Sequence, residues 1–187
     1  MASNNAHKID ELRAMLGSRF EIKSMAEVGC TDDIEEYGVT LEENSLIKAR
    51  YIFDKYRIPC LADDSGLEIM ALDMRPGVYS ARYAGIHGDH EGNMQKVLTE
   101  LGDTQNREGQ FRTVISLILS VTECYTFEGK VIGKIIHEKR GSGGFGYDPI
   151  FIPDGYTHTF AELSAEIKNT ISHRAEAVKR LVEKLCA

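Results

Sequence analysis

The sequence lacks the features of several large protein classes. Its longest mainly apolar run, residues 114–121, contains two serines and is far shorter than the ~20 residues that a membrane-spanning helix needs. The N-terminus has no apolar core of the signal-peptide kind. The cysteines form no C-x-x-C pair, which argues against a zinc knuckle and a disulfide framework; they are Cys30, Cys60, Cys124 and Cys186. We therefore expect a soluble, cytoplasmic protein with reduced thiols and no membrane partner.

The chain also has fewer positively charged than negatively charged residues. The chain has 22 Lys and Arg residues against 29 Asp and Glu residues, which gives a net charge of −7. Such a balance does not provide the broad basic surface that binds a nucleic-acid backbone. Any phosphate binding has to be local, and we expect no nucleic-acid partner.

Two catalytic motifs are missing as well. No G-x-x-x-x-G-K-[ST] segment is present, which argues against the P-loop nucleotide hydrolases. Ser65, Ser80 and Ser172 lie outside any G-x-S-x-G elbow, so serine-nucleophile chemistry has little support. No repeat, low-complexity linker or domain boundary interrupts the 187 residues, and we expect one domain over residues 1–187 with a substantial core.

The apolar pattern predicts alternating helices and strands followed by a hairpin. Helical spacing predicts helices over residues 9–16, 41–53, 94–101 and 171–185, the second with a capping box at Thr40. Residues 20–25, the segment ending at Asp63-Asp64, and residues 111–121 and 125–136 read as strands. The last two strands are expected to pair as a long antiparallel hairpin. The fold class that we predict is α/β, with a mixed, twisted sheet flanked by helices.

A short apolar run ends in two adjacent carboxylates, Asp63 and Asp64, followed by Ser65-Gly66. Carboxylates at the end of a strand are well placed to hold a divalent cation against a ligand, and magnesium with a phosphate ester is the first expectation. The alternative is that one carboxylate caps a turn that Ser65-Gly66 completes.

The glycine-rich segment Gly141–Gly146 formally matches the G-x-G-x-x-G fingerprint of dinucleotide-binding folds. That fingerprint opens a helix, whereas residues 147–153 here contain two prolines and read as extended chain. We therefore reject a Rossmann interpretation. Such a loop approaches a flat ligand closely, and Phe145 and Tyr147 offer aromatic faces to a nucleobase. The alternative is a turn packed by its own aromatic side chains.

Two further polar clusters have a functional and a plain interpretation. Lys168, His173 and Arg174 lie near the start of the last helix and are suited to a phosphate or a purine oxygen, although basic residues at a helix end are often simply solvated. The segment His87–His90 resembles a metal-ligand cluster, but no periodicity fixes its geometry. We prefer a polar loop there.

Six segments in order along the chain resemble the inosine triphosphate pyrophosphatase family. They are residues 3–8, 40–44, 62–67, 76–85, 144–149 and 172–174. Members of that family hydrolyse non-standard purine triphosphates such as ITP, dITP and XTP to the monophosphate and pyrophosphate. The resemblance implies this activity, two lobes around a central cleft, Mg²⁺ as cofactor and a homodimer. It also implies a short apolar strand before Ser3, so with only Met1-Ala2 there we expect that strand to be missing.

The resemblance also implies roles for residues around the phosphates. Asp64 is expected to accept the proton of the attacking water and, with Glu35, to hold magnesium; spacing to Gly38 favours Glu35 over its neighbour Glu36. The triphosphate is expected to contact Lys48 and the loop of Ser3, Asn4, Asn5, Ala6, His7 and Lys8.

The remaining implied contacts concern the sugar and base. Ser65 and Lys168 are expected to contact the nucleotide, and the base pocket is expected to be shaped by Phe145, Gly146, Tyr147 and Asp148. His173 and Arg174 are expected to read the oxygen-bearing edge of the base. A donor such as Arg174 pairs with the 6-carbonyl of hypoxanthine or xanthine and opposes the 6-amino group of adenine.

Two rival functions use some of the same residues. A non-catalytic sensor of purine triphosphates needs the loop and the basic cluster but no activated water. A magnesium-dependent phosphomonoesterase acting on a phosphosugar needs the Asp63-Asp64 pair but leaves Phe145 and Tyr147 without a base to hold.

Overall fold

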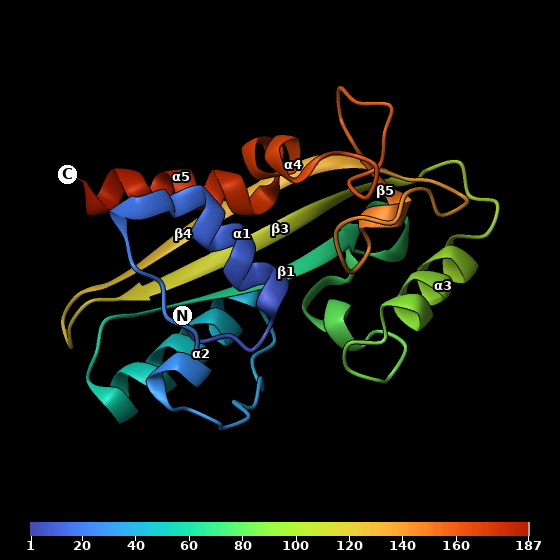
Figure 1. Cartoon of the computed structure of the whole chain (residues 1–187). Helices are drawn as coiled ribbons and strands as arrows, with labels where there is room; N and C mark the ends of the chain where they lie inside the picture. Colours follow the sequence, from blue (N-terminus) through green and yellow to red (C-terminus); the bar gives the residue numbers. More distant parts are fainter. Residues whose placement is uncertain (187) are drawn as a thin grey trace. The chain divides into compact units, whose positions relative to one another are not determined.

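Five strands form one sheet in the order β2–β1–β3–β4–β5 (Figure 1). The computed structural model describes residues 1–186. The strands are β1 (Cys60–Ile69), β2 (Arg75–Pro76), β3 (Glu108–Ile118), β4 (Cys124–Ile135) and β5 (Phe151–Pro153). The helices are α1 (Ala6–Leu16), α2 (Leu41–Tyr56), α3 (His90–Leu101), α4 (Ala165–Ile171) and α5 (His173–Leu185). Short 3₁₀ turns cover Gly17–Arg19, Ala26–Val28, Met70–Leu72, Gly77–Arg82 and Asp148–Ile150.

The predicted α/β class, the flanking helices and the long hairpin are confirmed. The sheet is antiparallel where a mixed one was expected, with Glu68 opposite Pro76 in the β1–β2 pair and Lys134 opposite Ile152 in the β4–β5 pair. The chain divides into two compact units, which matches the number of lobes that the resemblance implies. Unit 1 comprises residues 1–64, 113–129 and 174–186, and unit 2 comprises residues 65–112 and 130–173.

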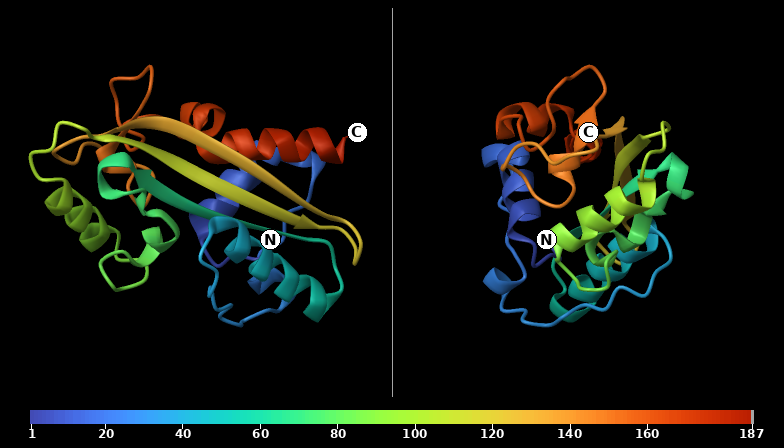
Figure 2. Two further views of the ribbon diagram at one scale, coloured as in Figure 1. Left: turned by 180° about the vertical axis from the view of Figure 1, so that it is seen from behind. Right: turned by 90° about the vertical axis from the view of Figure 1, so that its right-hand side faces the viewer.

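In unit 1, helices cover both faces of the strands (Figures 1 and 2), and the strand side chains alternate between the two helical layers. Leu61 of β1 and Ile115 of β3 pack with side chains of α1 and α5. Ala62 of β1 and Ile118 of β3 pack with side chains of α2. Because successive side chains of a strand point to opposite faces, each helical layer receives every second residue of the strand.

Helix α2 begins where the sequence predicts. The Thr40 side chain accepts the Glu43 amide, and the Glu43 side chain returns to the Thr40 amide, which completes the capping box. At the other end Arg57 adopts a left-handed conformation with φ 55° and ends the helix. A box of this kind fixes where the chain enters the helix.

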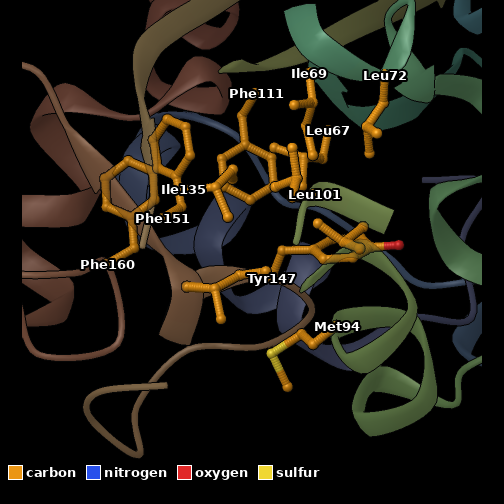
Figure 3. Packing of buried hydrophobic residues seen from close by; sticks show 12 residues of the cluster. Leu67, Ile69, Leu72, Met94, Leu101, Phe111, Ile135, Tyr147, Phe151 and Phe160 are labelled. Carbon is orange, nitrogen blue, oxygen red and sulfur yellow. The ribbon is translucent and has the colours of Figure 1, made fainter. Parts of the chain in front are cut away.

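Unit 2 has an aromatic core of its own (Figure 3). Phe111 of β3 lies 4.7 Å from the Phe151 ring and 6.0 Å from the Phe160 ring, measured between ring centroids. Helix α3 adds Met94 and Leu101 to the same cluster. The sheet segment of unit 2 is therefore covered by aromatic and aliphatic side chains.

The structure differs from the sequence predictions in two further elements and adds three short ones. The prediction of a strand over residues 20–25 is wrong. The carbonyl oxygen of Ile22 accepts hydrogen bonds from the Arg13 guanidinium, and that of Lys23 accepts one from the Met1 amino group. These donors take the place of a neighbouring strand. Helix α4 and strands β2 and β5 were not predicted, because segments this short carry little periodicity. Helix α3 begins at His90, earlier than predicted, because Asp89 caps it by accepting the Gly92 amide at 2.9 Å.

Candidate active site

The paired carboxylates of β1 lie on opposite faces of the sheet segment in unit 1. Asp63 follows the alternation of Leu61, and Asp64 follows that of Ala62. The side chains of α1 and α5 contact Asp63, whereas a side chain of α2 contacts Asp64. The two carboxylates therefore have different nearest ionic partners, although the charges of Lys8 and Lys48 act on both.

Asp63 is surrounded by cations. Its Oδ2 atom lies 2.9 Å from Arg174 Nη2 and 3.3 Å from Lys8 Nζ, and the Asp63 side chain is fully buried. Arg174 also donates to Glu11, which lies one helical turn after Lys8 on α1. Burial alone would raise the pKa of Asp63, but the charges of Lys8 and Arg174 outweigh it and hold the pKa well below its usual range. Asp63 is thus held in its ionised form by Lys8 and Arg174.

Asp64 has a different environment. Its Oδ1 atom lies 3.2 Å from Lys48 Nζ, and Lys48 lies 2.6 Å from Glu36 Oε1. Burial raises the pKa of Asp64, with Lys48 opposing that rise. Among residues 1–186, the buried Oδ2 atom of Asp64 has no hydrogen-bond partner. A buried carboxylate oxygen left over in this way is suited to a water molecule or a metal ion.

The N-terminal loop prepares the start of α1. Ser3 Oγ accepts the Asn5 amide at 3.1 Å, and Asn5 Oδ1 caps the helix by accepting the Lys8 amide at 3.3 Å. Asn4, Ala6 and His7 are exposed beside these groups. The first amides of an eleven-residue helix, together with the Lys8 ammonium, favour an anion at this end.

A second cluster of charge and aromatic surface lies within unit 2. Asp148 accepts the Lys168 ammonium at 2.6 Å and the Phe145 amide at 2.8 Å. Lys168 Nζ also lies 4.8 Å from the centre of the half-buried Phe145 ring. Gly144, with φ 69°, has no room for a Cβ because Asp148 occupies that space. These contacts fix the glycine-rich turn and leave the Phe145 ring as its accessible aromatic face.

Comparisons with known proteins identify the family of this chain. The Ham1 family model matches residues 1–184. The chain belongs to the Ham1 family.

Ham1 relatives share the sequence over nearly their full lengths. A dITP/XTP pyrophosphatase of Porphyromonas gingivalis is 50% identical, over 100% of this chain and 96% of the relative. A dITP/XTP pyrophosphatase of Bacillus subtilis is 46% identical, over 97% of this chain and 93% of the relative. The solved Ham1 protein of Staphylococcus aureus superposes with a TM-score of 0.89 at 41% identity, over 98% of this chain and 95% of that one. The family indicated by the six sequence segments is confirmed.

Within this Ham1 chain, several predicted site residues have contacts that differ from their predicted roles. Tyr147 is buried in the unit 2 core and donates to Ser80 O at 2.8 Å, so its ring packs inside the protein (Figure 3). His173 stacks on Phe111 with 5.0 Å between ring centroids. Arg174 is 1% exposed and contacts two carboxylates. The geometry gives no support to base stacking by Tyr147 or base reading by Arg174.

Glu35 and Glu36 also separate. Glu36 contacts Lys48, and through this shared ammonium it lies near Asp64. Glu35 is exposed and lines a groove with Tyr37 and Val39 against the outer side of α2. The assignment of Glu35 as a metal ligand stays a prediction, and the contact of Glu36 with Lys48 supports the alternative that the sequence left open.

The structure also shows residues that the sequence reasoning missed. Glu11 follows Lys8 by three positions, so one helical face carries both. This spacing can be read from the sequence, but the pairing of Glu11 with Arg174 cannot.

His87 and His90 belong to no metal cluster, since the described residues contain no group of three His, Cys, Asp or Glu side chains arranged to hold an ion. Ser65 follows Asp64 directly and is half-buried in unit 2.

Proposed function

We propose that this chain hydrolyses non-standard purine nucleoside triphosphates, with ITP, dITP and XTP as substrates, to the monophosphate and pyrophosphate. The observation that carries the proposal is the state of Asp64 in a Ham1-family chain. Its pKa is raised by burial, Lys48 contacts one carboxylate oxygen, and the other oxygen is buried without a partner among residues 1–186. A general base works best when its pKa is moved toward the working pH.

Asp64 is the proposed acceptor of a proton from water. A water molecule beside the available Oδ2 atom is oriented for attack on the α-phosphorus, and its proton passes to the carboxylate. Pyrophosphate leaves with the electrons of the broken P–O bond. Asp63 cannot replace Asp64 in this role because Lys8 and Arg174 keep its pKa low.

The positive groups of unit 1 are proposed to bind the triphosphate. Lys8, Lys48 and the first amides of α1 offset negative charge on the phosphates as the bond breaks. The loop of Ser3, Asn4, Asn5, Ala6 and His7 supplies these amides and their cap. The capped helix start supports this assignment.

Magnesium is the proposed cofactor. Carboxylate oxygens are the ligands that Mg²⁺ prefers, and the buried Oδ2 atom of Asp64 fits this donor type. Asp64 and one carboxylate of the Glu35–Glu36 pair would hold the ion, which supplies further charge neutralisation at the phosphates. Separate Glu35→Gln and Glu36→Gln variants, compared by magnesium titration, identify the ligand as the one whose loss raises the magnesium requirement.

Unit 2 is proposed to bind the sugar and base. The half-buried Phe145 ring is the accessible aromatic group of the glycine-rich turn, with Gly146 next to it; the buried Lys168 ammonium lies beside that ring and pairs with Asp148. Ser65 is proposed to contact the nucleotide as well. Aromatic faces stack on nucleobases. Direct reading of the base by His173 and Arg174 is the less supported part of the proposal, because both side chains are buried.

The test is to incubate the protein with Mg²⁺ and ITP, with ATP and GTP in parallel, and to resolve the products by ion-exchange chromatography. We expect IMP and pyrophosphate from ITP, with much slower turnover of ATP and GTP. IDP with orthophosphate would contradict the proposed bond cleavage. Bound but intact ITP would instead favour a sensor of purine triphosphates.

We also propose a cytoplasmic homodimer. The family resemblance supports the dimer, and the action on a nucleotide pool supports the compartment. All four cysteines, which lie in the described part of the chain, are free, and no helix within residues 1–186 is long and apolar enough to cross a bilayer. Light scattering after size exclusion is expected to give twice the 20.9 kDa chain mass; a value of one chain mass would contradict the dimer.

A further inference from the structure

Two side chains at the start of α2 accept hydrogen bonds from three consecutive backbone amides of the preceding segment. Asn44 Oδ1 accepts the Gly38 amide at 2.8 Å, and Glu43 Oε2 accepts the amides of Val39 and Thr40 at 2.7 and 3.2 Å. A Cβ at Gly38 would lie 2.6 Å from Asn44 Oδ1, so only glycine fits this approach. The chain is therefore fixed at Gly38, two residues after Glu36.

Asn44 has an unused donor. Its side chain is 0% exposed, and the Gly38 amide requires an oxygen acceptor, which fixes the orientation of the carboxamide. Among residues 1–186, Nδ2 has no hydrogen-bond partner. Leaving a buried amide donor unpaired destabilises the fold, so an unpaired donor in a native protein calls for an explanation.

The position of Asn44 on α2 relates it to the candidate active site. Lys48 follows it by four residues, so both side chains lie on one face of the helix. That Lys48 contacts Asp64 and Glu36. The same helical face thus orients a lysine, a segment with two candidate metal ligands and an unpartnered amide.

We propose that Asn44 is a positioning residue of this site, with two separate roles. Its Oδ1 atom fixes the segment bearing Glu35 and Glu36, so that one of these carboxylates meets a cation held by Asp64. Its Nδ2 atom donates to an oxygen of the bound magnesium–triphosphate. The proposal rests on the proposed function, because it requires a nucleotide and its metal ion at this face of α2.

Asn93 of unit 2 supplies a matched control. It is also a buried asparagine near the start of a helix, and it also holds a preceding segment: Oδ1 accepts the Ala84 amide at 2.7 Å, and Nδ2 donates to Ala81 O at 3.2 Å. Both of its polar atoms are therefore satisfied inside the protein. Replacing it disturbs the fold in a comparable way without removing a donor from the candidate active site.

The experiment compares Asn44→Leu, Asn44→Asp and Asn93→Leu well below their melting temperatures. In Asn44→Leu, we expect about a tenfold rise in the Mg²⁺ concentration for half-maximal ITP hydrolysis, as is usual when a group supporting a metal ligand is lost. Binding of Mn²⁺, measured by electron paramagnetic resonance without substrate, is expected to weaken by a similar factor. Asn93→Leu is expected to lower the melting temperature while leaving both readouts unchanged.

Asn44→Asp separates the two roles. It retains an oxygen for the Gly38 amide but replaces the donor with an acceptor, so we expect near-normal Mn²⁺ binding and a KM for ITP raised about tenfold. Unchanged metal readouts in Asn44→Leu would overturn the first role, and an unchanged KM in Asn44→Asp would overturn the second. Failure of the wild-type protein to release pyrophosphate would instead count against the proposed function, since Mn²⁺ binding is measured independently of turnover.

Discussion

Asp63 and Asp64 are identical side chains joined by one peptide bond, yet the two faces of β1 give them opposite properties. On the face covered by α1 and α5, Asp63 is compensated by Lys8 and Arg174 and its pKa is lowered. On the face covered by α2, Asp64 contacts Lys48 through one oxygen, and its pKa is raised. The strand alternation thus separates a structural carboxylate from a chemically available one.

The difference shows how a fold assigns roles to residues that the sequence leaves equal. Lys8 and Arg174 both lie against one oxygen of Asp63 and keep this carboxylate ionised. Lys48 is shared between Asp64 and Glu36, and one Asp64 oxygen is left for a ligand. Four substitutions or titrations test this contrast.

The largest expected effect is on folding. Asp63→Asn leaves Lys8 and Arg174 buried with their main counter-charge removed, and breaking a buried ion pair in this way costs about 3–5 kcal/mol. We expect urea unfolding to report a loss of this size. A loss below about 1 kcal/mol would show that Glu11 alone compensates Arg174, and the structural role of Asp63 would be wrong.

The second effect is on catalysis. Asp64→Asn removes the proposed proton acceptor and a proposed metal ligand, and we expect kcat for ITP to fall by about 10²–10⁴-fold. The stability of the fold is expected to be unchanged or higher, because a desolvated charge is removed while Lys48 retains its ion pair with Glu36. Steady-state kinetics and thermal melting check both parts. If Asp64→Asn unfolds like Asp63→Asn, the contrast between the faces fails.

The third test uses pH. Asp64 must be ionised to accept a proton, so its raised pKa predicts that kcat/KM falls on the acid side at a pH above ~3.9, the usual aspartate value. Asp63 has a lowered pKa in the folded state, so its stabilising contribution is present above ~3.9 and is lost only as pH falls through the lower folded value. We expect activity to disappear at a higher pH than the fold, as followed by circular dichroism. Coincident losses would contradict the assignment.

The smallest effect concerns the backbone between the two faces. Thr113 Oγ1 donates to Asp64 O at 3.0 Å and is fully buried. Thr113→Val keeps the shape of the side chain and removes this bond, so we expect a loss of about 0.5–1.5 kcal/mol in urea unfolding. The acid limb of the activity profile is expected to stay in place. A shifted limb would show that Thr113 helps set the environment of Asp64.

Much of this architecture was predictable from local patterns. The capping box at Thr40 predicted the start of α2, and the β-branched runs predicted the β3–β4 hairpin. The strand predicted over residues 20–25 was wrong because its partners are the Arg13 side chain and the amino terminus, which no strand periodicity reveals. The expectation of a mixed sheet likewise depended on which strands would become neighbours.

The sequence predicted which residues lie in the candidate active site better than it predicted what each of them does. Asp64, Lys8 and Lys48 were named from the sequence, and within unit 1 the structure places Lys48 against Asp64 and Lys8 against the adjacent Asp63. The burial of Tyr147 depends on Ser80, 67 positions away, and that of Arg174 on Asp63, 111 positions away. Pairings at such separations follow from tertiary packing, so a motif alone could not distinguish a ligand contact from a core contact.

The long separation within the Asp63–Arg174 pair also has a consequence for synthesis. A ribosome delivers Lys8, Glu11 and Asp63 early, while Arg174 is added 111 residues after its partner. Until then the nascent chain carries two acidic groups and one basic group of this cluster, and Asp63 and Glu11 lack their arginine partner. The C-terminal helix therefore supplies the last charge of this cluster. A polypeptide that stops before Arg174 lacks the guanidinium that pairs with Asp63 and Glu11 in the folded protein.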